Sequence, residues 1–402
     1  MNIWRSLRGL PRDLWILSAA SLINRAGTMV LPFLVLYLTK EHGWSAPRAG
    51  LALAVYGAGS IIVAPVAGRL SDRIGPLPII RWSLVTSGVL LLAFPFVSGF
   101  PGIIAITLAW ALSTEAFRPA NLALIADIAS PEQRKPAYAL TRLAINLGMS
   151  VGPAAAGFIA AKSFSLIFII DGITTLVAAL VLFATPIKAV HQVKKVESVA
   201  PVDQLRRLLV LDDRQFLFFL GALFLTGAVF FQHEGALPLF LVDDLGLSTA
   251  FYGFLFTINT VMIVFMEVPL NAATSDWPHK RALALGSFLF AAGSGVFVFA
   301  TGPVAIIAGM VIWTFGEMML FPQASAYVAD IALPHRRGEY MGAYSLSFSL
   351  AFAFAPWAGT TVFAEFGAVV LWTSVFVVGC FAALMMLQVT TTVAAPELER
   401  SL

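Results

Sequence analysis

Long apolar stretches, each about twenty residues in length, follow one another along the whole chain of 402 residues. A helix needs roughly 20 apolar residues to cross the hydrocarbon core of a membrane, which is about 30 Å thick. The sequence therefore predicts an all-α polytopic membrane protein with twelve spanning helices. The expected spans are residues 13–39, 47–70, 77–98, 102–127, 138–161, 164–184, 214–241, 249–271, 282–300, 304–328, 340–362 and 368–390.

The composition supports this assignment and excludes several other classes of protein. Hydrophobic residues make up 59% of the chain and charged residues 12%, whereas a soluble protein is about half apolar and about a quarter charged. The basic residues lie in short loops rather than in one patch or tail, so nucleic-acid binding is not expected. The single cysteine, Cys380, lies in an apolar run. It provides neither a disulfide framework nor a thiolate metal site, and no metal or cofactor is predicted.

The distribution of lysine and arginine predicts the orientation of the chain. Cytoplasmic loops carry an excess of these residues, and an N-terminus on the inside leaves only Lys40, Arg48 and Lys162 on the outer side. Both termini are then cytoplasmic. The compact loops and the lack of a targeting segment favour the plasma membrane of a bacterium, its inner membrane.

An internal repeat divides the chain into two halves. The segment that begins at Trp110 matches the segment that begins 203 residues later, at Trp313, and the run ADIA at 126–129 recurs at 329–332. Six spans per half make the repeats parallel about an axis along the membrane normal, an arrangement of transporters whose site lies between the halves near the midplane. The expected parts are an N-terminal six-helix bundle at 1–185, a cytoplasmic central loop at 186–213 and a C-terminal six-helix bundle at 214–402.

The loop between the second and third spans carries a signature motif. The segment GRLSDRIGPLPII at 68–80 resembles the motif G-x-L-x-D-R-x-G-R-[RK] of the major facilitator superfamily. The resemblance implies the major facilitator fold, in which the aspartate at this place is a latch that holds the cytoplasmic side closed. The two glycines allow close helix packing and a tight turn. The matching residues are Gly68, Leu70, Asp72, Arg73 and Gly75.

The motif departs from the family pattern at two positions. Pro76 and Leu77 replace residues that are usually basic, so the ion pair that the family forms to the end of the fourth span, here Asp127, does not form in the usual way. An alternative is that these charges only set loop topology. The second-half copy, at 271–281, is degenerate. The candidate replacements in the ion pair are Arg73, Arg81 and Arg134.

A second motif lies in the fifth span. The run GMSVGPAAAG, from Gly148, resembles the antiporter motif G-x-x-x-G-P-x-x-G-G of the same superfamily, with Ala156 in place of one glycine. Small residues let helix backbones approach closely, and a proline bends the helix. The resemblance implies an exporter of the twelve-span drug:proton antiporter group, and the alternative is small-residue packing alone. The matching residues are Gly148, Gly152, Pro153 and Gly157.

Polar residues lie near the middle of the first, fourth, seventh and tenth spans, which the resemblance assigns to the central cavity. Ionisable residues inside a membrane usually face a cavity or a partner. Arg25 is therefore expected to face water, a carboxylate or the substrate. The predicted substrate cavity comprises Asn24, Arg25, Glu115, Arg118, Gln232, His233 and Glu317.

The same four spans carry more carboxylates than arginines. Glu115 and Arg118 lie three residues apart and can pair on one helical face, with Arg25 as a second partner, either as a structural ion pair or in substrate binding. The second half offers only His233 as a cation. One of its carboxylates is therefore expected to lack a cationic partner and to carry the coupled proton. The candidates, in order of preference, are Glu317, Glu234 and Glu115, and the alternative for each is a neutral structural role.

Three charged residues in other spans are interpreted as structural or gating groups: Glu267, Asp171 and Arg142. The sequence favours a secondary transporter that exports small amphipathic molecules, such as drugs, in exchange for protons by alternating access, as a monomer in the lipid bilayer. An importer or facilitator of an anionic or neutral metabolite stays open, as does a membrane sensor that transports nothing. An enzyme is not expected, because the sequence has no HExxH, CxxC or phosphate-binding Gly-Lys-Ser run and its loops are too short to hold a soluble catalytic domain.

Overall fold

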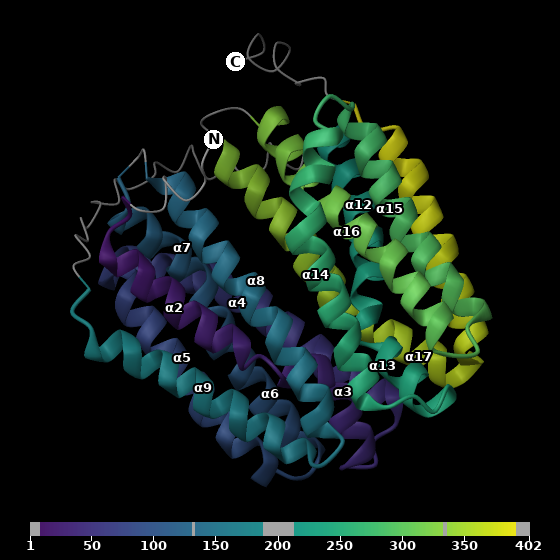
Figure 1. The fold of residues 1–402 in the computed structure, drawn as a ribbon, viewed down its shortest axis with the longest axis horizontal. Helices are drawn as coiled ribbons and strands as arrows, with labels where there is room; N and C mark the ends of the chain where they lie inside the picture. Colours follow the sequence, from purple (N-terminus) through teal and green to yellow (C-terminus); the bar gives the residue numbers. More distant parts are fainter. Residues whose placement is uncertain (1–8, 131–132, 188–212, 333–335, 391–402) are drawn as a thin grey trace. The chain divides into compact units, whose positions relative to one another are not determined.

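A computed structural model describes residues 9–130, 133–187, 213–332 and 336–390. These residues form helices joined by short connections and contain no strand, which confirms the predicted all-α class (Figure 1). The expected central loop at 186–213 lies outside the described residues, apart from 186, 187 and 213. The helices are α2 (Arg12–Ala26), α3 (Val30–Lys40), α4 (Ala46–Ile74), α5 (Pro76–Ala93), α6 (Phe100–Glu115), α7 (Phe117–Ile128), α8 (Arg134–Ala160), α9 (Phe164–Ala184), α12 (Arg214–Phe230), α13 (Ala236–Leu239), α14 (Thr249–Ala273), α15 (His279–Val296), α16 (Pro303–Ile331) and α17 (Arg337–Leu387), with short helical turns η1 (Phe94–Phe96), η2 (Phe231–His233), η3 (Phe240–Asp244) and η4 (Phe297–Phe299).

In the described part of the chain, eleven helical segments are long and apolar enough to cross a membrane. The last of them, α17, has 51 residues and contains Gly367, whose φ of 80° and ψ of 175° divide it into two helices. Glycine takes this conformation readily because it has no Cβ. The division lies between the predicted eleventh and twelfth spans, so the described helices account for the twelve predicted spans.

Three of the predicted spans are interrupted near their middle, and all three are spans assigned to the central cavity. In span 1, α2 ends at Ala26 and α3 begins at Val30. In span 4, α6 ends at Glu115 and α7 begins two residues later. In span 7, α12 ends at Phe230 and continues as the 3-10 turn η2. The fourth cavity span, α16, is a continuous helix.

Proline explains where these spans can open. A proline has no backbone N–H, so the carbonyl four residues before it lacks its helical donor. Pro322 lies inside α16 without interrupting it, so a proline permits a break but does not impose one. The prolines at the three breaks are Pro32, Pro119 and Pro238, and the carbonyls four residues earlier belong to Thr28, Glu115 and Glu234.

The chain divides into two compact units. The first comprises Met1–Lys195 and Leu241–Thr260, and the second comprises Val196–Phe240 and Val261–Leu402. In the first unit, α2 packs against α8 and α9, α5 packs against α9, and α4 packs against α6. In the second unit, α15 packs against α16 and α17, and α12 packs against α17.

Residues 241–260, which follow the seventh span, belong to the first unit and make polar contacts within it. The Tyr252 hydroxyl donates to the backbone carbonyl of Pro32 at 3.1 Å. Lys40 and Asp243 form an ion pair. The two residues lie 203 positions apart, which is the offset of the internal repeat, so they occupy equivalent positions in its two copies. The first copy has a lysine at this position and the second has an aspartate, and the two side chains pair within this unit.

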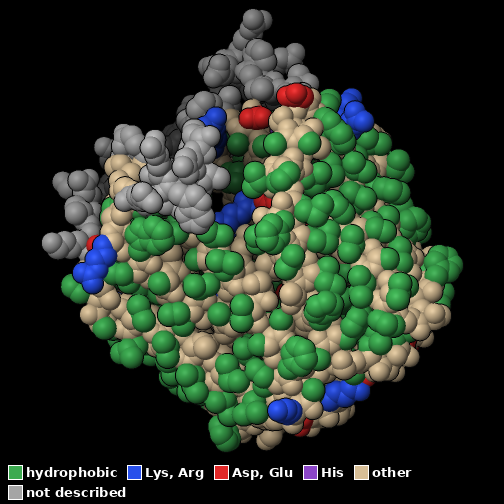
Figure 2. Space-filling view, viewed as in Figure 1, with side chains coloured by type: hydrophobic (Ala, Val, Ile, Leu, Met, Phe, Trp, Pro, Cys, Tyr) green, Lys and Arg blue, Asp and Glu red, His purple; other side chains and the backbone are tan. Residues whose placement is uncertain are grey.

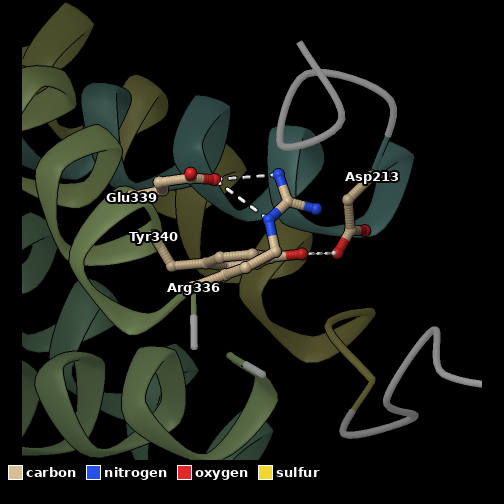
Figure 3. Close-up of polar contacts among 4 residues, drawn as sticks. All are labelled: Asp213, Arg336, Glu339 and Tyr340. Atoms are coloured by element: carbon tan, nitrogen blue, oxygen red, sulfur yellow. Dashed lines mark hydrogen bonds and ion pairs between the residues drawn. The ribbon is translucent and has the colours of Figure 1, made fainter. Parts of the chain in front are cut away.

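A polar cluster joins the start of α12 to the start of α17 in the second unit (Figure 3). Asp213 accepts the backbone N–H of Phe216 at 3.0 Å and so caps α12. Its other carboxylate oxygen accepts the Tyr340 hydroxyl at 3.0 Å. Beside it, Arg336 donates from Nε and Nη2 to one oxygen of Glu339, at 3.0 and 2.8 Å. A capping carboxylate satisfies amides that have no partner in the first helical turn, so this cluster sets the point at which span 7 begins.

Large hydrophobic side chains cover much of the face shown in Figure 2. Among the most exposed are Phe265 and Val268 on α14 and Val304 at the start of α16, at 73%, 72% and 80%. Soluble monomers rarely expose contiguous apolar surface of this extent. The exterior therefore suits contact with lipid, as the apolar spans predict.

Candidate functional site

The break in span 1 is held by polar groups of α9. The backbone N–H groups of Met29 and Val30 donate to one oxygen of Asp171, at 3.0 and 3.2 Å. Asp171 is 4% exposed, and its negative charge lies at the N-terminus of α3, where a helix favours an anion. One turn earlier in span 1, the Asn24 side-chain amide donates to the Thr175 hydroxyl at 3.0 Å. The predicted cavity residue Asn24 is therefore tied to the neighbouring helix.

Two glycines of the antiporter motif pack against the other side of the same break. A Cβ built at Gly148 would lie 2.6 Å from the Cβ of Arg25, and one at Gly152 would lie 2.8 Å from the carbonyl oxygen of Thr28. Such distances leave no room for a larger side chain. The expectation that small residues bring helix backbones together in this motif is confirmed.

The far end of the motif contacts the start of α14. A Cβ at Gly157 would lie 2.5 Å from the carbonyl oxygen of Thr249, whose hydroxyl donates to the Gly157 carbonyl at 2.9 Å. A Cβ at Gly253 would lie 2.5 Å from the carbonyl oxygen of Pro153. The motif therefore joins span 5 to span 1 at one end and to the segment 241–260 at the other.

Glu115, the last residue of α6, is bound by a residue that the sequence did not indicate. The Tyr56 hydroxyl of α4 donates to Glu115 Oε1 at 2.9 Å. Arg118 is exposed, and within the described residues neither it nor Arg25 forms an ion pair with Glu115. The expected pairing is therefore wrong. Ala116, the one residue between α6 and α7, keeps helical backbone angles, so the missing pair reflects the exposure of Arg118 and the hydrogen bond from Tyr56 to Glu115.

Arg25 lies one residue before the end of α2 and is partly buried. Its Nε is buried and has no hydrogen-bond partner among the described residues. Buried N–H groups are nearly always paired, with protein or with water. Water or a ligand group could supply the acceptor for this nitrogen, and the expectation that Arg25 faces water, a carboxylate or the substrate stays a prediction.

Gln232, His233 and Glu234 point in different directions from the broken span 7. The Gln232 side-chain amide donates to the carbonyls of Ala228 and Ala355, at 3.1 and 2.9 Å, which ties it to α17. His233 Nδ1 donates to the Phe230 carbonyl at 2.7 Å. Its other ring nitrogen, Nε2, lies 3.6 Å from Glu234 Oε1. His233 and Glu234 therefore lie close to each other but beyond hydrogen-bond distance, while Gln232 is held by backbone carbonyls.

An aromatic cluster surrounds His233 in the second unit. Phe230 stacks on Trp313 with ring centroids 4.9 Å apart, and His233 lies 5.3 Å from Trp313. A cavity of about 10 Å³ next to the imidazole, also lined by Gln232 and Trp372, has room for about one water molecule. The phenylalanines of this cluster pack against one another and against Trp313 inside the second unit. The members of the cluster are Phe230, Phe231, Phe290, Trp313, Phe321 and Phe348.

Two tryptophans at equivalent positions of the repeat are core residues. Trp110 and Trp313 are 3% and 5% exposed, and Trp110 packs on Tyr56 with ring centroids 4.8 Å apart. Glu317 lies one turn after Trp313, is partly buried and is the middle residue of α16. Its role in proton coupling stays a prediction.

The residues of the loop motif lie at the ends of α4, α7 and α8. Gly75, with φ of 89°, makes the predicted tight turn between α4 and α5. A Cβ at Gly68 would meet no described atom within 4 Å, so close packing is not found there. Arg81 donates to the carbonyls of Leu182 and Thr185 at the end of α9. Four motif residues are exposed: Asp72, Arg73, Asp127 and Arg134.

The second-half copy of this motif retains an ion pair although its letters are degenerate. His279 Nε2 lies 3.0 Å from Asp330 Oδ2. The equivalent positions in the first half, 203 residues earlier, are Pro76 and Asp127. Pro76 stands where the family motif usually has a basic residue. The second copy therefore has a polar contact between these two equivalent positions.

Comparison with known proteins decides the family. The sequence model of the Major Facilitator Superfamily matches residues 14–248 and 233–401. The chain belongs to the Major Facilitator Superfamily. A crystal structure of a peptide transporter POT in complex with alafosfalin has a TM-score of 0.79 at 16% identity, covering 96% of this chain and 98% of that chain, which shows the same fold.

Three relatives within the superfamily are informative. The chain is 25% identical over 383 residues to the uncharacterized MFS-type transporter YqjV of Bacillus subtilis, covering 92% of this chain and 90% of the relative. It is 24% identical over 393 residues to a Na(+), Li(+), K(+)/H(+) antiporter of Planococcus maritimus, covering 90% and 91%. It is 28% identical over 167 residues to quinolone resistance protein NorA of Staphylococcus aureus, 42% of each chain.

Membership of the Major Facilitator Superfamily makes the protein an integral membrane transporter of small molecules and not an enzyme. Sequence reasoning missed three features of the site: the Tyr56 hydroxyl on Glu115, the Asp171 cap on span 1, and the aromatic cluster beside His233. Only one of these has a signal in the sequence. Gly27 and Pro32 in one span point to a break there, and a break in a membrane needs a polar partner such as Asp171.

Proposed function

We propose that the protein is a proton-coupled antiporter that exports small amphipathic compounds by alternating access. The observation that carries the proposal is the coincidence of helix breaks with ionisable side chains. The breaks in spans 1, 4 and 7 lie beside Arg25, Glu115 and the pair His233 and Glu234. Discontinuous helices form the substrate and ion sites of many transporters, because helix ends and freed carbonyls supply polar groups there.

Arg25 and Glu115 are assigned to substrate binding. The buried Nε of Arg25 is a donor that needs an acceptor, and an anionic or carbonyl group of a substrate supplies one. Glu115, oriented by Tyr56, offers a negative group to a substrate that carries a cation. An amphipathic molecule with a polar head thus finds both kinds of partner in the first unit, as in the predicted cavity.

Glu317 is assigned to proton coupling, with Glu234 and Glu115 as the second and third candidates. A carboxylate in the middle of a spanning helix is expensive to ionise unless a partner or water compensates its charge. It is therefore suited to take up a proton from outside and to release it when substrate binds. The two six-helix halves then rock about the central site, with Asp72 and its neighbours as the cytoplasmic latch.

The protein is placed in the inner membrane of a bacterium, with both termini in the cytoplasm, where it acts as a monomer. The distribution of lysine and arginine over the short loops supports this orientation. The relatives named above, all from bacteria, support the location.

A second candidate function is exchange of monovalent cations for protons. It is favoured by the relative from Planococcus maritimus, whose name describes this exchange and whose similarity covers 90% of the chain. In that case the glutamates of the cavity spans bind the cation directly, and Arg25 has no substrate role. The two candidate functions therefore differ in the role of Arg25, which binds the substrate in the first and has no substrate role in the second.

Transport by energised, everted membrane vesicles tests the proposal. A dye that reports the pH gradient is followed while amphipathic cations, amphipathic anions, NaCl or KCl are added separately. Proton release on addition of an amphipathic compound, lost in Glu317→Gln, supports the proposal. The matched control is Glu365→Gln, which makes the same chemical change at an exposed position and is expected to transport like the parent protein.

The other outcomes separate the alternatives. Proton release with NaCl or KCl alone, retained in Arg25→Gln, selects cation exchange. If no compound moves protons while labelled compounds still equilibrate across the membrane, the protein is a facilitator and the assignment of Glu317 is wrong.

A further inference from the structure

Asp171 is a buried carboxylate that the proposed transport cycle does not use. It lies on α9, outside the four cavity spans, and is 4% exposed. Both N–H groups that it accepts, from Met29 and Val30, belong to the start of α3. The first amides of a helix have no partner within the helix, and in a membrane an unsatisfied amide costs several kcal/mol. Without Asp171 the interrupted form of span 1 would lose these two hydrogen bonds.

Other contacts from α9 converge on the same few residues. Thr175, one turn after Asp171 on α9, accepts a hydrogen bond from the Asn24 side chain at 3.0 Å, so α9 presents two polar side chains to span 1 beside the break. A Cβ at Gly27 would lie 1.7 Å from the Thr174 hydroxyl oxygen. The break is therefore fitted closely to α9 on this side.

Arg25 is the charged group that acts on Asp171 from span 1. On the side of α8, the backbone of Arg25 and Thr28 packs against Gly148 and Gly152 at the distances given above. Arg25 thus belongs to a short segment with α8 on one side and α9 on the other. Its direction depends on where the segment breaks, because α2 and α3 do not form one continuous helix.

We propose that Asp171 is a positioning residue: its hydrogen bonds to Met29 and Val30 hold span 1 in its broken form and so aim Arg25 into the substrate cavity. The inference rests on the proposed function, because it assigns Arg25 to substrate binding. The role belongs to the acceptor oxygen of Asp171 and its position. Its negative charge is a secondary contribution.

The two conservative substitutions separate position from charge. Asp171→Asn keeps an acceptor oxygen at the same distance from the backbone and removes the charge. Asp171→Glu keeps the charge and moves the carboxylate by one methylene. Asp171→Ala removes both. The role of positioning predicts that asparagine substitutes for aspartate and that glutamate and alanine do not.

A reporter thiol at the break measures this independently of transport. In a Cys380→Ser background, which removes the only natural cysteine, Thr28→Cys is labelled with a maleimide in membrane vesicles. Loss of a helix cap changes the population of the opened form by about tenfold. Labelling is therefore expected to be about tenfold faster with Asp171→Glu or Asp171→Ala, and within about twofold of the parent with Asp171→Asn.

The same variants are assayed for transport of any compound that the parent protein moves. Asp171→Glu is expected to raise KM by about tenfold with little change in kcat, and Asp171→Asn is expected to retain the parent KM. Fast labelling of Asp171→Asn would show that the charge of Asp171, and not its position, holds the break. Labelling of Asp171→Glu and Asp171→Ala at the parent rate would show that Asp171 does not hold the break. Either result overturns the proposal. If the labelling pattern is found but the parent transports nothing, the proposed function fails and the positioning role stands.

Discussion

Gly152 of α8 packs against the backbone of span 1 at its break, which makes Gly152→Ala a direct test of this packing. A Cβ at this position would lie 2.8 Å from the carbonyl oxygen of Thr28 and 3.1 Å from those of Ala26 and Arg25. All three are backbone atoms. No side chain can rotate away to relieve the contacts, so either α8 or span 1 has to move.

The size of the effect follows from two opposing contributions. Overpacking of a well-packed core costs about 1–3 kcal/mol, and three backbone contacts place this substitution near about 3 kcal/mol. Alanine is better than glycine in a helix interior by about 1 kcal/mol. Gly152→Ala is therefore expected to lower the free energy of unfolding by about 2 kcal/mol.

Gly342 in α17 provides a matched control. A Cβ there would meet nothing within 4 Å, so Gly342→Ala should gain about 1 kcal/mol from helix propensity alone. Thermal unfolding of the purified proteins in one detergent measures both, and the apparent Tm of Gly152→Ala should lie several degrees below that of the control. Equal apparent Tm values for the two variants would refute the packing described for the antiporter motif.

Two further predictions concern stability. Gly367→Ala places a Cβ on a residue with φ of 80° and ψ of 175°, which costs about 1–3 kcal/mol of backbone strain. No described atom lies within 4 Å of this Cβ, so backbone strain is the main effect expected. A melting temperature equal to that of Gly342→Ala would contradict the assigned turn. For His279 and Asp330, a double-mutant cycle with alanine should give a coupling energy of about 0.2–1 kcal/mol, since Asp330 is 67% exposed. A coupling well above about 2 kcal/mol would mean that the pair is buried rather than exposed.

The spans could be predicted from the sequence because their length is set by the membrane. A run of about 20 apolar residues is favourable in lipid whatever its neighbours are, and a helix satisfies its own backbone. For this reason the boundary inside α17 could be predicted between residues 362 and 368, and the structure places it at Gly367. The internal repeat is also visible in the sequence alone, whereas the pairs Lys40 with Asp243 and His279 with Asp330 are seen only in the structure.

The breaks in the cavity spans could not be predicted in the same way. Prolines occur inside many of the described helices, and most of these helices remain continuous. Pro32, Pro119 and Pro238 accompany breaks, and only the surroundings separate them from the others. The prolines inside continuous helices include Pro65, Pro153, Pro269 and Pro322.

The partners of the site residues depended on tertiary structure for a related reason. Spacing of three residues allows Glu115 and Arg118 to pair, but Arg118 is exposed and Tyr56, from another helix, donates to Glu115 instead. Local spacing shows which side chains can reach each other, and tertiary packing decides which partner is used.

The sequence by itself determined that this chain is a helical membrane protein with an internal repeat, and which of its spans carry charged residues. These properties depend on single residues and their distance along the chain. Tertiary structure alone decided that Asp171 caps span 1, that Tyr56 holds Glu115 and that phenylalanines enclose His233. Each of these is a contact between helices, and the energy of a buried polar or aromatic group depends on which partner lies within reach.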